Sequence, residues 1–337
     1  MTIIDSLFPD GVATPTLIPA DTLACVLTPR LAIDAIATYL RGGDSVASER
    51  MVTPVAAGDM LLMPAESSEW VGVKLASVAP ANPSRALPRI QGTYHLFDAA
   101  TLTPRAVFDA TMLTALRTPA VSAVAADLLA PPGPAHLVVF GTSVQAEAHV
   151  ACLAEVRDLA SVTLVGRDPG RAAALAARLE HPASWLAADD AGPHLRAALE
   201  AASIVATCTS ASHPVVDGRW LAPDALVIAI GSHSPDAREL DGETLRNAYL
   251  VVENREAAWR EYGDLILARA EGAIGGGAVT CDLRELARNE APPKPPGRRA
   301  VFKSAGMGWE DLAVASAAWT ALSDADPSMV GCQGGCG

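Results

Sequence analysis

The chain is short of positive charge, of charged residues in general, and of long uninterrupted apolar runs. Its 337 residues contain 25 Lys and Arg against 38 Asp and Glu, a formal net charge of −13. A protein that binds nucleic acid needs a basic face, and no basic run of five or more residues compensates for this balance. No stretch of about 18 apolar residues occurs, so we expect no ordinary transmembrane helix. Neither a nucleic acid nor a membrane is expected as a partner.

Cysteines are few and scattered, and the sequence MTIIDSLFPD lacks the charged segment and apolar stretch of a signal peptide. Six cysteines in such a chain are typical of reduced side chains in a cytoplasmic protein. Only Cys332 and Cys336 are closely spaced, and they stand among glycines with no other ligand nearby. We therefore expect a disordered tail there, no bound metal, and a cytoplasmic location.

Half of the residues are hydrophobic, so a large core can form, and the length allows two domains. From His136 to about Asn254, short apolar runs alternate with helical patterns. The runs show no polar alternation, which is typical of parallel strands covered by helices on both faces. This predicts a doubly wound α/β domain of the Rossmann type. Its predicted strands are HLVVFG, VTLVG at 162–166, SIVAT at 203–207, ALVIAI at 225–230 and YLVV at 249–252.

The two ends of the chain have a different pattern. Segments such as GDMLLMPA and WVGVKLASV indicate a mostly antiparallel sheet, and a helix, MLTALRTPAVSAVAADLLA, follows it. PPGP and APPKPPGRR are predicted linkers. The last segment, VFKSAGMGWEDLAVASAAWTAL, predicts a strand, a turn and a helix that rejoins the first domain. We therefore predict one domain at 131–296, inserted in a mixed α+β domain made of 1–130 and 297–337.

The first predicted strand of the inserted domain runs into a degenerate dinucleotide loop, LVVFGTSVQAEAH. Gly141 supplies the tight turn and Ala146 the helix-packing position. Ser143 stands where a second glycine usually lets the backbone approach the pyrophosphate. The pattern G-x-S-x-x-A by itself also fits an ordinary strand–helix turn, but the alternating strands and helices around it favour a dinucleotide.

The end of the second predicted strand, VGRDP, bears on which dinucleotide binds. An acidic residue there commonly binds the ribose 2′-hydroxyl of NAD, whereas arginine suits the 2′-phosphate of NADP. Arg167 comes first, Asp168 follows it, and Arg171 lies one turn further on. We expect NADP(H) to be preferred and NAD(H) to be possible. The alternative is that these arginines only form a solvated surface.

Two cations stand within apolar sequence. Lys74 shares a strand face with Gly72 and Ala76; if it is desolvated, its pKa falls and it can donate a proton or anchor a substrate. The alternative is a lysine at a sheet edge. Arg117, between apolar residues of a predicted helix, could clasp a carboxylate or only complete an ion pair. Arg50, in SERMVTP, is less informative by itself.

Five segments in this order resemble the ornithine cyclodeaminase/mu-crystallin family: GVKLASVAPAN, FDATMLTALRTPA, LVVFGTSVQAEAHV, IAIGSHSPDARELD and VFKSAGMGWEDLA. The resemblance extends from about residue 17 to residue 322. It implies a Rossmann domain that binds NAD(P), inserted in a substrate-binding domain built from both chain ends. It also implies a homodimer joined through the substrate-binding domains.

The resemblance also implies functional residues. Arg50, Lys74 and Arg117 match family residues that hold the α-carboxylate and the reacting nitrogen of the substrate. The residues expected at the cofactor are Arg117, Thr118, Gly141, Ser143, Val144, Gln145, Arg167, Thr207, Gly231, Ser232 and Ser304.

His233, in IGSHSPD, departs from part of the family. The true cyclodeaminases of the family that the chain resembles have an aspartate at this position. A histidine can transfer protons near neutral pH, but it cannot supply a carboxylate's charge beside a cationic amine. Members without the aspartate resemble ketimine or cyclic-imine reductases that use NAD(P)H. The alternative is that His233 only lines the nicotinamide pocket.

We therefore predict an NAD(P)H-dependent oxidoreductase that acts on C–N bonds and reduces a small cyclic or linear α-imino acid, such as Δ1-pyrroline-2-carboxylate or a ketimine, to an L-amino acid. Arg50 and Arg117 would hold the carboxylate, and Lys74 would hydrogen-bond or protonate the imine nitrogen. His233 would shuttle a proton or shape the pocket.

The alternatives are cyclodeamination of ornithine to proline and ammonia with recycled NAD, an amino-acid or opine-type dehydrogenase, and a non-catalytic crystallin-like protein that binds NADPH. The combination of Arg50, Lys74 and Arg117 argues against the non-catalytic crystallin-like protein.

Overall fold

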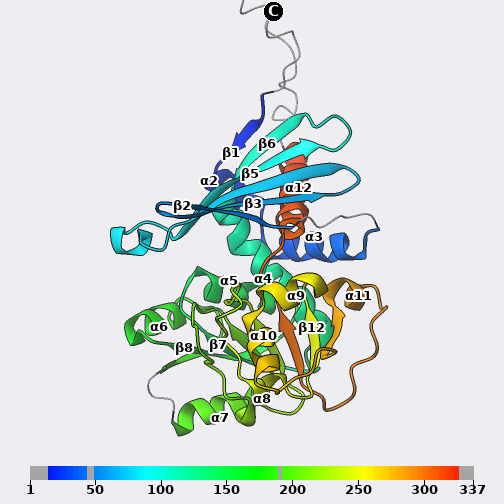
Figure 1. Cartoon of the computed structure of the whole chain (residues 1–337). Coiled ribbons are helices and arrows are strands. Elements are labelled where there is room, and N and C mark those ends of the chain that lie inside the picture. The colour runs from blue at the N-terminus through cyan, green and yellow to red at the C-terminus, as the bar shows by residue number, and fades with distance from the viewer. Residues whose placement is uncertain (1–13, 44–48, 189–191, 326–337) are drawn as a thin grey trace, which may run out of the picture. The chain divides into compact units, whose positions relative to one another are not determined.

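The computed structural model describes residues 14–43, 49–188 and 192–325 and consists of two compact units (Figure 1). One unit contains the described residues up to Arg117 together with those from Met307 onward. The other spans Thr118–Gly306. Cys332 and Cys336, for which a disordered tail is expected, lie outside the described residues.

The unit built from both chain ends contains a six-stranded sheet in the order β1-β6-β5-β4-β3-β2. β1 pairs with β6 in parallel, and the other neighbours pair antiparallel, which confirms the predicted mostly antiparallel sheet. The strands are β1 (Thr16–Ile18), β2 (Met51–Val55), β3 (Gly58–Glu66), β4 (Trp70–Val78), β5 (Ile90–Asp98) and β6 (Pro104–Asp109).

Helices cover one face of this sheet. α12 (Gly308–Ala325) packs on β3, β4 and β5 and against α3 (Pro29–Arg41) (Figure 1). α3 begins where Thr28 accepts a hydrogen bond from the backbone N–H of Leu31, with proline at the first helical position, and it ends at Gly42. The remaining short elements of this unit are α2 (Ala20–Ala24) and the 3₁₀ turn η1 (Asn82–Arg85).

The opposite face of the sheet carries apolar side chains. Strand pairing places Met51, Leu62 and Leu75 in one row across β2, β3 and β4. Met51 is 52% exposed and Leu75 is 37% exposed. Because neighbouring residues of a strand point to opposite faces, Lys74 lies on the buried face.

The second unit is a doubly wound domain with eight strands that all pair in parallel, as the sequence predicted. Their order is β13-β12-β14-β11-β10-β7-β8-β9. Every residue of β10, β11, β12 and β14 is buried, which explains why these strands lack polar alternation. The strands are β7 (Ala135–Phe140), β8 (Leu159–Gly166), β9 (Ala183–Ala187), β10 (Ile204–Thr207), β11 (Leu226–Ala229), β12 (Tyr249–Val252), β13 (Val279–Asp282) and β14 (Ala300–Lys303).

The order of the strands reverses at β7. The chain first adds β8 and β9 on one side of β7 and then returns to place β10 on the other side. Ligands of doubly wound domains bind beyond the carboxyl ends of the strands at such a reversal. The helical elements of this unit are α5 (Val144–Ala154), α6 (Pro169–Ala176), α7 (Pro193–Ala201), η2 (Gly218–Trp220), α8 (Gly242–Leu245), α9 (Arg255–Glu261), α10 (Gly263–Ala270) and α11 (Leu283–Ala287).

The border between the units falls inside α4 (Ala110–Leu129), after Arg117, and again after Gly306. The sequence placed these borders at 131 and 297, at the proline-rich segments. The difference between the predicted and the observed borders has two causes. α4 continues through Pro119 without a break, and β14 pairs with β11 and β12, so the strand before Ser304 belongs to the inserted unit.

α4 is long and apolar enough, by length and composition alone, to cross a membrane, although no uninterrupted apolar run occurs in it. In the structure, 67% of its most apolar window is buried inside the protein. The core helices of globular proteins meet the same two criteria, so this helix is weak evidence for a membrane span.

Candidate active site

Lys74 lies in the middle of β4, opposite Met63 of β3 and Tyr94 of β5. Its side chain is 4% exposed. The Nζ atom lies 2.7 Å from Oδ2 of Asp311 and donates a hydrogen bond of 3.4 Å to Oγ1 of Thr114. Burial lowers the pKa of Lys74, and the nearby charge of Asp311 opposes that shift. The lysine is therefore desolvated, as its apolar neighbours in the sequence suggested, and its catalytic role stays a prediction.

Arg117 lies beside the same carboxylates, in the first part of α4. Its Nη1 donates a short hydrogen bond to Oε2 of Glu310, and its Nε lies 3.6 Å from Oδ1 of Asp311. The two cations and two carboxylates form a buried group with no net formal charge, which we call the Lys74 cluster: Lys74, Arg117, Glu310 and Asp311. Of the two alternatives for Arg117, the structure shows the ion pair, and a contact with a substrate carboxylate stays a prediction.

Sequence reasoning missed Glu310 and Asp311, although both stand in the quoted motif VFKSAGMGWEDLA. Both side chains are fully buried in α12. The signal was available, because two adjacent acids open a helix that is otherwise almost entirely apolar. A carboxylate inside such a helix needs a buried cation or several hydrogen bonds. What the sequence does not show is which cations these acids meet.

Tyr94 and Gly72 complete the surroundings of Lys74. A Cβ atom on Gly72 would lie 2.0 Å from the Tyr94 hydroxyl, so only glycine leaves room for this phenol. Among the described residues, the Tyr94 hydroxyl has no hydrogen-bond partner. Burial and the charge of Asp311 raise the pKa of Tyr94 well above its usual value, so the phenol stays protonated. Arg50 is half-buried just before β2, at the far edge of the same sheet, and its role also stays a prediction.

The turn after β7 has the geometry expected of a dinucleotide loop. Gly141 has a φ of 122°, and a Cβ atom there would lie 2.6 Å from the carbonyl oxygen of Cys208 at the end of β10. Ser143 precedes α5 as its N-cap without a side-chain capping bond, and Ala146 is fully buried. The free N–H groups and the dipole at the start of such a helix favour an anion. These residues fit a pyrophosphate group.

A buried histidine links two residues expected at the cofactor. His149 donates from Nδ1 to the carbonyl oxygen of Gln145 at 2.7 Å, and its Nε2 lies 2.9 Å from Oγ of Ser122. Ser122 lies one turn after Thr118, whose carbonyl oxygen is 3.3 Å from the same Oγ. Burial lowers the pKa of His149 to about 4, so the ring is neutral at physiological pH. Val144 next to this link is 66% exposed.

The end of β8 separates the roles of Arg167 and Asp168. Oδ1 of Asp168 accepts a hydrogen bond of 3.1 Å from the backbone N–H of Arg171 and caps α6. The carboxylate that could have held a ribose 2′-hydroxyl is thus partly used by the helix. The Arg167 side chain is exposed.

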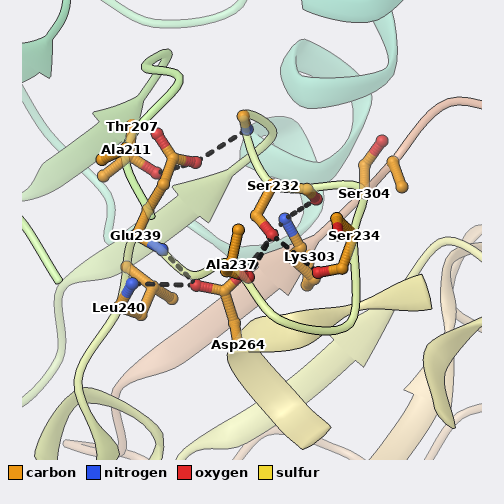
Figure 2. Close-up of polar contacts among 12 residues, drawn as sticks. Thr207, Ala211, Ser232, Ser234, Ala237, Glu239, Leu240, Asp264, Lys303 and Ser304 are labelled. Carbon is orange, nitrogen blue, oxygen red and sulfur yellow. Dashed lines mark hydrogen bonds and ion pairs between the residues drawn. The ribbon is translucent and has the colours of Figure 1, made fainter. Parts of the chain in front are cut away.

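A buried carboxylate joins the ends of β10 and β11 (Figure 2). Glu239 accepts hydrogen bonds from Oγ1 of Thr207 at 2.8 Å and from the backbone N–H of Gly231 at 2.7 Å. It also accepts from the backbone N–H and the hydroxyl of Thr209, at 2.8 and 2.7 Å. The hydroxyl hydrogen of Thr207 and the backbone N–H groups of Gly231 and Thr209 are therefore engaged by Glu239.

A second buried contact fixes the loop after β11. Nζ of Lys303 donates to the carbonyl oxygen of Ser232 at 2.7 Å and lies 3.1 Å from Oδ2 of Asp264 (Figure 2). Oδ1 of Asp264 accepts from the backbone N–H groups of Glu239 and Leu240, at 2.7 and 2.8 Å. We call Glu239, Asp264 and Lys303 the Glu239 network. Sequence reasoning missed all three of these residues.

The remaining predicted residues lie at the same edge of the parallel sheet. The Ser304 hydroxyl donates to Oε2 of Glu253 at 2.9 Å, and the Ser232 hydroxyl donates to the carbonyl oxygen of Ala237. Both serines are buried, whereas His233 is exposed. The structure thus brings Gly141, Thr207, Gly231, Ser232 and Ser304 to the carboxyl ends of four neighbouring strands. In the ranges 14–43, 49–188 and 192–325, no group of three His, Cys, Asp or Glu residues could hold a metal ion.

The chain matches known proteins over most of its length. A profile of the ornithine cyclodeaminase/mu-crystallin family matches residues 30–325. The chain is 33% identical to ketimine reductase mu-crystallin of Mus musculus, over 86% of this chain and 90% of the mouse protein. It is 31% identical to Delta(1)-pyrroline-2-carboxylate reductase 2 of Burkholderia ambifaria, over 93% of this chain and 95% of that protein.

A solved structure supports the fold across both units. The Delta(1)-pyrroline-2-carboxylate reductase of Thermococcus litoralis, determined in complex with NADH and L-proline, has a TM-score of 0.85 and 28% sequence identity. The match covers 92% of this chain and 98% of that structure. Together with the matched profile and the two relatives, it confirms the resemblance that the five sequence motifs indicated. The chain belongs to the ornithine cyclodeaminase/mu-crystallin family.

Proposed function

We propose that this protein reduces a small cyclic or linear α-imino acid, of the Δ1-pyrroline-2-carboxylate or ketimine type, to an L-amino acid with NAD(P)H. The observation that carries the proposal is the buried Lys74, whose pKa burial lowers below the ordinary value of a lysine. Reduction of a C=N bond adds a hydride to carbon and a proton to nitrogen. The dinucleotide supplies the hydride when it is bound, and Lys74 supplies the proton.

Two features of the chain favour reduction over cyclodeamination of ornithine. His233 stands where the cyclodeaminases that the chain resembles have an aspartate. Its side chain is exposed, in the loop after β11. Relatives that match over most of the chain include ketimine reductase mu-crystallin and Delta(1)-pyrroline-2-carboxylate reductase 2. Arg50 and Arg117 hold the substrate carboxylate in this proposal, and His233 shapes the pocket or shuttles a proton.

The test compares oxidation of NADPH and NADH in the presence of Δ1-pyrroline-2-carboxylate and Δ1-piperideine-2-carboxylate with release of ammonia from ornithine. We expect rapid dinucleotide oxidation with at least one cyclic imine and formation of the corresponding L-amino acid. Proline and ammonia formed from ornithine at a comparable rate would contradict the proposal. A protein that binds NADPH without any turnover would support the crystallin-like alternative.

NADP(H) is the cofactor that we propose, and the end of β8 supports it. Asp168 caps α6 there, and the neighbouring Arg167 is exposed and suited to a 2′-phosphate.

The four cysteines among the described residues, Cys25, Cys152, Cys208 and Cys281, are all free thiols. This accords with the cytoplasmic location that we propose.

We also propose a homodimer joined through the apolar outer face of the antiparallel sheet. The row Met51, Leu62 and Leu75 on this face is of the kind that subunit interfaces cover. Light scattering is expected to give twice the chain mass for the native protein. Leu75→Glu, which places a charge in the row, is expected to give a monomer, with Leu102→Glu at another exposed leucine as the control. A native protein that is monomeric would contradict this assembly.

A further inference from the structure

Asp311 is held differently from an ordinary buried carboxylate. It is fully buried, yet neither of its oxygens accepts a well-directed hydrogen bond among the described residues. Its contacts are ionic: Lys74 at 2.7 Å and Arg117 at 3.6 Å. Burying a carboxylate costs several kcal/mol unless a partner compensates. The charge of Asp311 is therefore compensated by the two cations and not by the backbone.

The adjacent Glu310 has a different partner. It accepts hydrogen bonds from Arg117 and from the backbone N–H of Met307, the latter at 3.0 Å. Arginine keeps its charge at any pH that proteins tolerate, so the cation that Glu310 faces does not change its charge. Lysine in a buried site does titrate. Of the two neighbouring carboxylates, only Asp311 makes its shortest contact with a cation whose charge can change.

We infer that Asp311 is the positioning residue of Lys74: its carboxylate aims the ammonium group and keeps it protonated, so that Lys74 meets the substrate with its proton in place. This inference rests on the proposed function. The groups that face Lys74 are Asp311 and Glu310 from α12, Arg117 and Thr114 from α4, and Tyr94 from β5. β3 presents Met63 there, which does not titrate.

The proton balance of the step follows from these contacts. A Lys74 N–H bond breaks and its electron pair stays on Nζ, while the proton forms the new N–H bond of the substrate. The hydride of the reduced dinucleotide forms the new C–H bond. Solvent then returns a proton to the neutral Lys74, and Asp311 remains a carboxylate throughout. Activity therefore requires charged Lys74, so it is present below the pKa of Lys74 and is lost as the pH rises through that value.

Two isosteric variants separate this role from mere packing. Asp311→Asn removes the charge nearest to Lys74, so the pKa of Lys74 is expected to fall. The basic limb of the kcat/KM profile for imine reduction is then expected to move to lower pH, by roughly 1 to 3 pH units. Glu310→Gln is the matched control: it removes the adjacent buried charge, which faces Arg117, and is expected to move the limb much less. A basic limb that lies at the same pH in both variants and in the native protein would overturn the inference.

A direct measurement makes the result independent of turnover. The chain contains only three lysines, Lys74, Lys294 and Lys303. Selective [13Cε]lysine labelling therefore gives three NMR signals, and Lys74→Met identifies the signal of Lys74. We expect its titration midpoint to fall in Asp311→Asn and to move less in Glu310→Gln. An unmoved midpoint in Asp311→Asn would overturn the inference even if the native protein reduced no imine, whereas the absence of imine reduction would count against the proposed function alone.

Asp311→Glu covers the case in which Asp311→Asn does not fold. This variant keeps the charge but lengthens the side chain, so it is expected to lower kcat by displacing the ammonium while leaving the basic limb in its native position. A limb displaced to lower pH in Asp311→Glu would contradict the inference.

Discussion

Each unit of this protein buries a set of charged side chains, but the carboxylates of the two sets have different partners. In the Glu239 network, Glu239 accepts four hydrogen bonds, two of them from backbone N–H groups, and Asp264 accepts two more from the backbone. In the Lys74 cluster, the contacts that Asp311 makes among the described residues are with cationic side chains. Backbone donors satisfy the carboxylates of the first set, whereas Asp311 depends on two cations for its compensation. We therefore propose that the Glu239 network stabilises the fold and that the Lys74 cluster serves the chemistry.

The largest effect is expected in the Lys74 cluster. Lys74→Met removes the proposed proton donor, so kcat/KM for imine reduction is expected to fall by roughly 10²- to 10⁴-fold, the usual contribution of a general acid. The variant also leaves the buried Asp311 with Arg117 at 3.6 Å as its remaining cation, so the melting temperature is expected to fall as well. Steady-state kinetics and thermal unfolding measure the two quantities. Full retention of imine reduction would show that Lys74 is not the donor.

The matching change in the Glu239 network is Lys303→Met, which removes the other buried lysine. It leaves Asp264 without its cation in a fully buried position, a change that typically costs about 3–5 kcal/mol of unfolding free energy. We expect a large loss of stability in urea unfolding and no shift in the basic limb of the pH profile for the folded fraction. If Lys74→Met unfolded the protein while Lys303→Met left it stable, the roles assigned to the two sets would have to be exchanged.

A smaller effect is expected at Gly72, next to the Lys74 cluster. Gly72→Ala places a methyl group 2.0 Å from the Tyr94 hydroxyl, and overpacking of this kind costs roughly 1–3 kcal/mol. Combining Gly72→Ala with Tyr94→Leu, which removes the ring, is expected to recover part of that loss in urea unfolding. Additive losses in the double variant would show that the ring is not the cause.

The smallest effect concerns the choice of dinucleotide. Arg167→Ala is expected to raise the KM for NADPH by about tenfold, the equivalent of about 1.4 kcal/mol, because a contact to the 2′-phosphate is lost. The KM for NADH is expected to stay the same, which serves as the internal control. Arg171→Ala, one turn further on, tests whether the second arginine contributes. An unchanged NADPH preference in both variants would remove the basis for NADP.

The sequence predicted most of the fold because its signals are local. Apolar runs without polar alternation indicated the parallel sheet, and the strand that leads into Gly141 indicated the turn and the helix of a dinucleotide loop. For Lys74 the same reasoning left two alternatives, a desolvated lysine or a lysine at a sheet edge, and the structure shows a buried side chain. Sequence reasoning placed the borders of the units at proline-rich segments, whereas the compact units divide within α4 and after Gly306, because pairing of β14 with β11 depends on residues far apart in the chain.

The helices, the strands and the residue types at their ends can therefore be inferred from the chain alone, since they follow from local periodicity and turn chemistry. Which charges meet depends on how the chain folds. Arg117 and Glu310 are 193 positions apart in the chain, and no periodicity pairs them. Only packing of α12 on β4 brings Asp311 to Lys74. The energy of a buried charge depends on its spatial neighbours, and these are a property of the folded chain.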